Sequence, residues 1–73
     1  MAKKEKHAVY RVTEVIGTSS ESWEAAARSA VETASKTLRD LRIAEVTKLD
    51  VRVKDGKVTQ FRTRLALSFK YGS

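Results

Sequence analysis

The chain has 73 residues, a formal net charge of +6 and no cysteine. A chain this short forms one domain with a small core, and without a disulfide or a thiolate metal site its stability is expected to depend on oligomerisation. A single histidine excludes a zinc site built on a histidine pair within one chain. The sequence has no apolar run near 18 residues, so no membrane span is predicted. No apolar signal core follows the basic start MAKKEK, so a cytoplasmic protein is expected.

The first half of the chain predicts a strand followed by a helix. Residues 1–6 are a charged stretch without a pattern, which predicts a flexible basic arm ahead of a single domain, residues 7–73. Residues 8–16 alternate and are rich in β-branched types, which indicates a strand that ends at Gly17. The polar run that follows offers two N-caps for a helix over 21–41, either Thr18 in a capping box or Ser20. The apolar stripe of this helix comprises Trp23, Ala27, Ala30, Ala34, Leu38 and Leu41.

The second half predicts a β-hairpin. Residues 43–54 form a strand whose apolar residues change parity, which favours a bulge near Thr47–Lys48. Asp55-Gly56 is a two-residue hairpin turn, and residues 57–71 alternate cleanly. The fold class is therefore α+β, with the order β-α-β-β and a three-stranded antiparallel sheet packed on one long helix. Its sheet edges and its uncovered face need partners.

The chemistry of the chain favours binding over catalysis. There is no cysteine nucleophile, and His7 has no acid at a recognisable spacing. The stretch GTSSES could hold an anion at the helix start, but helix capping is the better interpretation. Trp23 is expected to be an anchor in the core or at a subunit contact.

Arginines on the uncovered face of the sheet have two interpretations. Arg62 and Arg64 could bind phosphate groups, or they could pair with Asp50, Glu45 or Glu14. Pairing is favoured, since charges on a strand face are usually solvated or paired. No stacking aromatic side chain is expected on this uncovered face, so nucleic acid is not an expected partner.

Several stretches together resemble the dodecin family. They are VYRVTEVIGTSSESWEAAARSAV, ASKTLRDL, the hairpin VKDGKVTQF and the ending LALSF, in this order and without gaps. The resemblance implies a small β-α-β-β subunit, a hollow shell of twelve copies and no enzymatic activity. It also implies flavin (FMN, FAD or riboflavin) as the usual ligand of the family, bound in pairs between aromatic side chains.

The flavin positions are altered in this chain. Where flavin-binding dodecins usually have L-x-x-L-D-W-F-E-V, the chain reads LRDLRIAEV, so that Ile43 stands in the place of the stacking tryptophan and Glu45 is retained. The glutamine that reads the edge of the flavin ring corresponds to Arg62, and a common arginine corresponds to Asp50. The resemblance thus implies a homododecameric shell that binds or stores a small ligand, with an altered flavin site at Ile43, Glu45 and Arg62.

An alternative comes from a divergent branch of the same family. The combinations SWE-x-AA, R-[IV]-A-x-V and L-x-[VL]-SFK are similar to a branch that includes calcium-binding dodecins. Calcium requires oxygen ligands. No EF-hand spacing is present, and Glu14 and Asp50 are candidate metal ligands. The alternative function is a calcium- or other metal-binding dodecin, or a purely structural one, without flavin.

Overall fold

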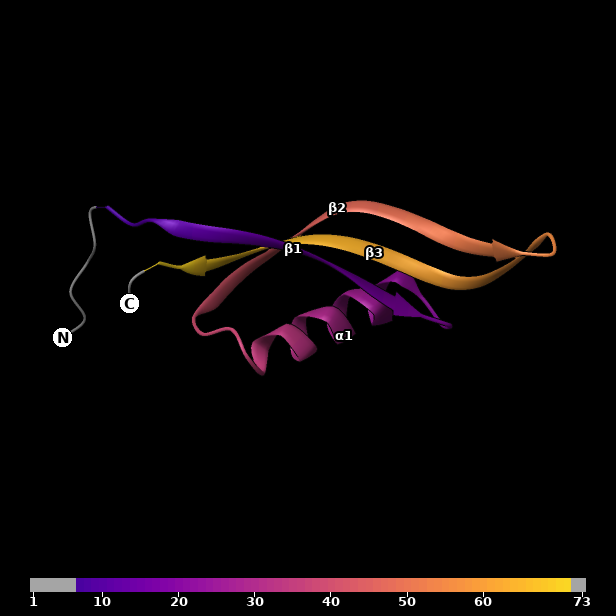
Figure 1. Ribbon diagram of the computed structural model, residues 1–73, viewed down its shortest axis with the longest axis horizontal. Helices are drawn as coiled ribbons and strands as arrows, with labels where there is room; N and C mark the ends of the chain where they lie inside the picture. Colours follow the sequence, from indigo (N-terminus) through magenta and orange to yellow (C-terminus); the bar gives the residue numbers. More distant parts are fainter. Residues whose placement is uncertain (1–6, 72–73) are drawn as a thin grey trace.

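The computed structural model describes residues 7–71, so the predicted arm, residues 1–6, lies outside the described residues. The element order is β1 (Tyr10–Ser19), α1 (Trp23–Ser35), β2 (Leu41–Lys54) and β3 (Lys57–Lys70). The strands form one antiparallel sheet in the order β1-β3-β2, and α1 covers one of its faces (Figure 1). The predicted fold class is confirmed.

Gly17 lies inside β1 and does not end it, contrary to the sequence prediction. It pairs with Thr63 on the face of the sheet that α1 covers. A Cβ atom at this position would run into the backbone carbonyl of Ala26 and would lie 2.9 Å from the Cβ of Ala30. The glycine therefore permits the close approach of the helix, and the strand continues past it to Ser19.

The helix is shorter than predicted at both ends. Its N-cap is Ser22, whose side chain accepts a hydrogen bond from the backbone N–H of Ala25 at 3.0 Å, so both predicted N-caps were wrong. The helix ends at Ser35, and the chain turns through residues 36–40, where Asp40 takes a left-handed conformation with φ 58°. Aspartate is among the few residues that adopt this conformation readily. Leu38 and Leu41 remain half-buried beyond the helix, and for this reason they extended the helical pattern of the sequence.

The core consists of few side chains. Along β3, Leu65, Leu67 and Phe69 are buried, as the clean alternation predicts, and Thr63 is buried with them. The helix contributes Ala26, which is fully buried and was absent from the predicted stripe. The buried face of the helix is thus rotated by part of a turn relative to the predicted stripe. The close contact with Gly17 requires a small residue on the sheet-facing side of the helix, and Ala26 lies there.

A β-bulge near Thr47 decides which residues of β2 face the helix. The register with β3 shifts between Val46 and Lys48, as predicted, and the Thr47 hydroxyl donates to the carbonyl oxygen of Arg64 at 3.2 Å. Ile43 pairs with Ser68 on the face away from α1. The alternation of the sequence predicted Ile43 and Leu49 on the same face of the sheet. That prediction was wrong, because the extra residue at the bulge reverses the alternation between them.

The helix packs mainly on β1 and β3, which leaves a groove between α1 and β2. This α1–β2 groove has a volume of about 440 Å³ and is open to solvent. Val46, on its β2 side, is 49% exposed. The groove is lined by Glu24, Ala27, Arg28, Val31, Glu32, Ala44, Val46 and Leu65.

Candidate functional site

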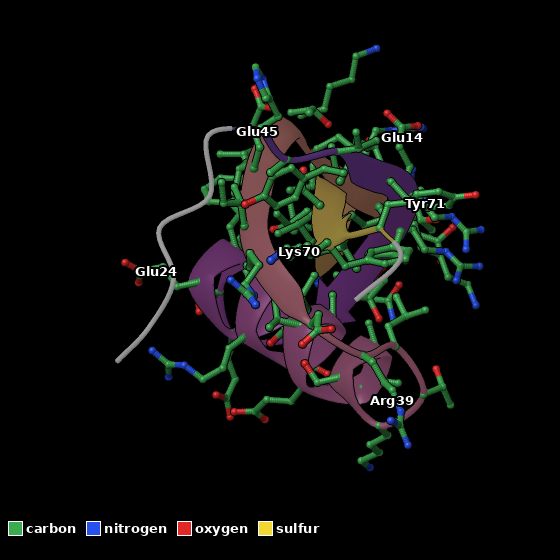
Figure 2. All side chains as sticks on the ribbon, turned by 90° about the vertical axis from the view of Figure 1, so that its left-hand side faces the viewer. Glu14, Glu24, Arg39, Glu45, Lys70 and Tyr71 are labelled. Atoms are coloured by element: carbon green, nitrogen blue, oxygen red, sulfur yellow. The ribbon has the colours of Figure 1, made fainter. Side chains whose placement is uncertain are left out.

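The face of the sheet that α1 does not cover carries most of the residues to which the sequence assigns a function. We call it the open face. Strand register places on it Tyr10, Val12, Glu14 and Ile16 from β1, Ile43, Glu45, Lys48 and Asp50 from β2, and Arg62, Arg64, Ala66 and Ser68 from β3. In Figure 2, Glu14 and Glu45 lie at the top of the view, on the opposite side from the helix.

Asp50 and Arg62 form a two-point ion pair on the open face. They are register partners, and Arg62 donates from Nε to Oδ1 at 2.7 Å and from Nη2 to Oδ2 at 3.2 Å. The hydrogen bond from Arg62 holds the pKa of Asp50 below its ordinary value, assisted by the charges of Arg62, Arg64 and Lys48 and opposed by desolvation. The same hydrogen bond raises the pKa of Arg62. The predicted pairing is confirmed here.

Trp23 connects this ion pair to the start of the helix. Its indole Nε1–H donates to the carbonyl oxygen of Asp50 at 3.0 Å, and its ring meets Phe61 edge-on at a centroid distance of 5.1 Å. The hydroxyl of buried Thr63 donates to the carbonyl oxygen of Trp23 at 2.9 Å. Trp23 therefore anchors the helix on β2 and β3, as expected, while 38% of it remains exposed.

Two glutamates flank one small residue of the central strand. Glu14 of β1 and Glu45 of β2 are both register partners of Ala66, and both side chains are exposed. Two inter-strand spacings separate their backbones, roughly 10 Å. Glu14 also accepts a long hydrogen bond of 3.4 Å from Arg64 Nη1. This row of Glu14, Ala66 and Glu45, which we call the glutamate row, was not predicted, because the pairing of β1 with β3 had no assigned register.

The structure does not bring the three predicted flavin positions together within one chain. Ile43 is opposite Ser68 and Glu45 is opposite Ala66, whereas Arg62 lies six residues from Ser68 along β3, roughly 20 Å away. Ile43 is 58% exposed. A site that used both Ile43 and Arg62 would have to combine residues of different subunits.

Sequence reasoning missed the apolar part of the open face. Val12 is 61% exposed and Ile16 43%, and Tyr10 lies at the end of the same strand row. Their common parity in AVYRVTEVI was the available signal. The expectation that no aromatic side chain lies on the open face was thus wrong for Tyr10, although it lies at the far end from Arg62.

Residues 7–71 contain no cluster of side chains that could hold a metal ion within one chain and no helix that could span a membrane. No three His, Cys, Asp or Glu side chains of this part of the chain gather closely enough to hold a metal ion. The candidate ligands Glu14 and Asp50 are each bonded to an arginine. In the same residues, no helix has the length and apolar character needed to cross a bilayer.

Comparisons with known proteins identify the fold and its relatives. The family model described as Dodecin matches residues 9–72. Calcium dodecin from Mycobacterium tuberculosis is 46% identical over 63 residues, which are 85% of this chain and 87% of that protein. Its crystal structure, described as having a novel calcium-binding site, superposes with a TM-score of 0.77 at 44% identity and covers 86% of this chain and 90% of that one.

A second dodecin structure is similar to this chain over almost the whole length of both chains. The dodecin from Streptomyces coelicolor has a TM-score of 0.86 and 40% identity and covers 94% of this chain and 99% of that one. Dodecins are non-enzymatic binding proteins, so the expectation that the chain is not an enzyme is confirmed. The match of the family model to nearly all residues, together with these relatives, shows that this chain belongs to the dodecin family.

Proposed function

We propose that the protein is a homododecameric shell that binds calcium and does not bind flavin. Dodecins are known to assemble as homododecamers, which supports the assembly. The isolated chain also has reason to assemble, because apolar side chains on both faces of its sheet are about half exposed, among them Val12, Ile43, Leu49 and Val53. Burial of such surface is the main favourable term in association.

The Asp50–Arg62 ion pair argues against flavin. Arg62 stands where the resemblance places a glutamine that reads the flavin ring edge, and its guanidinium is already bonded to Asp50 at two points. Arginine has donors only, so it cannot supply the acceptor of an amide. Ile43 offers no ring for stacking. A flavin would have to displace the Asp50 carboxylate from Arg62 without regaining the lost stacking.

The observation that carries calcium is the glutamate row. Glu14 and Glu45 present two exposed carboxylates on either side of Ala66, whose methyl group is too small to separate them. Calcium takes six to eight oxygen ligands, and two carboxylates supply at most four. The glutamate row therefore supplies only part of a calcium site. Oxygen atoms from the open face of another subunit, or water molecules, must complete it. The calcium dodecin of Mycobacterium tuberculosis, 46% identical, supports this ligand.

A calorimetric titration of calcium into chelator-treated protein tests the proposal. The unaltered protein should release or absorb heat on calcium addition, whereas Glu14→Gln/Glu45→Gln should lose at least roughly tenfold in affinity, since charged ligands set calcium affinity. The matched control is Glu21→Gln/Asp55→Asn, which removes two exposed carboxylates outside the glutamate row and the α1–β2 groove and should bind as the unaltered protein does. Light scattering on each sample shows that the shell is intact.

Two results would contradict the proposal. Equal calcium affinity in both double variants would remove the glutamate row as the site. Tight flavin binding with no response to calcium would reverse the choice of ligand.

A further inference from the structure

The β2–β3 hairpin extends past the helix and exposes an apolar pair at its tip. Figure 1 shows the hairpin continuing well beyond the start of α1. Val53 and Val58 are register partners and are 59% and 53% exposed. Lys54 and Lys57 form the next pair toward the turn, and they too are exposed. The tip thus combines two valines with two ammonium groups.

The α1–β2 groove has the complementary character. Its walls are apolar side chains, Ala27 and Val31 from the helix and Val46 from β2, and buried Leu65 forms its floor. Glu24 and Glu32 lie along its helical rim, with Arg28 between them, so the rim has a net charge of −1. A partner that carries apolar side chains together with positive charge fits it.

The groove cannot be filled by the hairpin of its own chain. Val46, in the groove, and Val53, at the tip, lie on the same strand seven residues apart, which is roughly 23 Å of extended backbone. A continuous β-strand cannot fold back over that distance. The hairpin that reaches the groove must come from another subunit.

We infer that Val53 and Val58 of one subunit occupy the α1–β2 groove of the next. This inference rests on the proposed assembly and specifies one of its contacts. The two valines alternate with Lys54 and Lys57, and the long lysine side chains can bend around the ribbon edge so that their ammonium groups reach Glu24 and Glu32. Tip and groove are different surfaces, so the contact is head-to-tail, and in the proposed closed shell it must form a ring and not an open filament. Rings of three subunits fit a closed shell of twelve.

Cysteine cross-linking tests the contact in a chain that has no cysteine of its own. In Ala27→Cys/Val58→Cys, a short bis-maleimide should join chains into covalent trimers on a denaturing gel. The control, Ser35→Cys/Val58→Cys, moves the helical cysteine two turns away to the far end of α1 and should stay monomeric. Monomers alone, or species that stop at two chains, in an intact particle would overturn the docking. If the unaltered protein formed no particle at all, the proposed assembly itself would be overturned.

A charge exchange gives an independent test by light scattering. Lys54→Glu/Lys57→Glu should dissociate at a concentration at least tenfold higher than the unaltered protein at low salt. Adding Glu24→Lys/Glu32→Lys should restore the assembly, because the signs again match. The control, Lys36→Glu/Arg39→Glu beyond the end of the helix, has the same change of charge and should leave the assembly unaffected. Equal weakening in the control and in the hairpin variant, or no restoration in the exchanged variant, would overturn the contact.

Discussion

Asp50 and Arg62 face each other across β2 and β3, and the Asp50 carboxylate accepts two hydrogen bonds from the one guanidinium. Both residues differ from the family pattern, in which the resemblance places an arginine and a glutamine at these positions. The structure accounts for the two differences together. A carboxylate on β2 pairs with a guanidinium on β3, so the charges of the two altered residues compensate each other within the chain.

Loss of this ion pair should weaken the assembly at low salt. Asp50→Asn leaves Arg62 next to Arg64 and Lys48 without its carboxylate, so like charges gather on the open face. We expect the thermal unfolding midpoint to fall by a few degrees at low ionic strength and by less at high salt, where screening already reduces these interactions. An unchanged midpoint at low salt would mean that Asp50 is only a solvated surface charge.

The same ion pair should contribute an acid limit to stability. Because the folded-state pKa of Asp50 lies below its ordinary value of 3.8, its contribution is present above that value and is lost as the pH falls through the lower, folded pKa. Unfolding midpoints of the unaltered protein should therefore converge with those of Asp50→Asn below pH 3.8. A gap between the two that stays constant through this range would contradict the assignment.

Gly17 should tolerate no side chain. Gly17→Ala places a methyl group against the backbone of Ala26 and the side chain of Ala30, so the helix must move away from the sheet. Overpacking of this kind costs about 1–3 kcal/mol, which chemical denaturation can measure.

Gly56, in the turn between β2 and β3, gives a contrasting control. Gly56→Ala has open space around its Cβ but keeps a positive φ of 76°, so its cost comes from backbone conformation alone. We expect it to lose about 1–2 kcal/mol, the cost of a left-handed conformation for a residue with a Cβ, and to keep the helix in place. If Gly17→Ala and Gly56→Ala changed the fluorescence of Trp23 equally, the contact between Gly17 and the helix would not be tight.

Restoring the family residues should restore flavin binding. The variant Ile43→Trp/Arg62→Gln/Asp50→Arg returns the stacking ring and the amide and leaves no carboxylate unpaired. An aromatic pair contributes about 0.5–1.5 kcal/mol beyond area burial, so flavin affinity should rise by roughly tenfold or somewhat less. Quenching of flavin fluorescence measures it, and Ile43→Leu is the matched control. No gain would mean that these positions do not correspond to the flavin site.

The sequence predicted most of the fold because its signals were local. The Asp55-Gly56 turn, the alternation along β3 and the change of parity at Thr47 each depend on a few neighbouring residues, and each was confirmed. Gly17 was wrongly predicted to end the strand because its role is a contact with Ala26, which lies on the following helix and not within the strand. The helix end was predicted wrongly because Leu38, in the turn after the helix, and Leu41, the first residue of β2, are half-buried without being helical.

The candidate site was less predictable because it depends on register. The hairpin turn alone would place Asp50 opposite Phe61, and only a register shift between Arg52 and Val53 brings Arg62 opposite it. The glutamate row required the register of β1 as well, and no turn connects β1 with β3. The proposed calcium site and docking contact need residues of other subunits, and the sequence of one chain has no pattern that shows where such contacts lie.

Native mass spectrometry of the protein in equimolar calcium and flavin mononucleotide shows both the assembly and its ligand in one spectrum. We expect a particle with the mass of twelve 8.2 kDa chains that carries bound calcium and no flavin. A particle of twelve chains that carries flavin and no calcium, or a chain that stays monomeric, would contradict it.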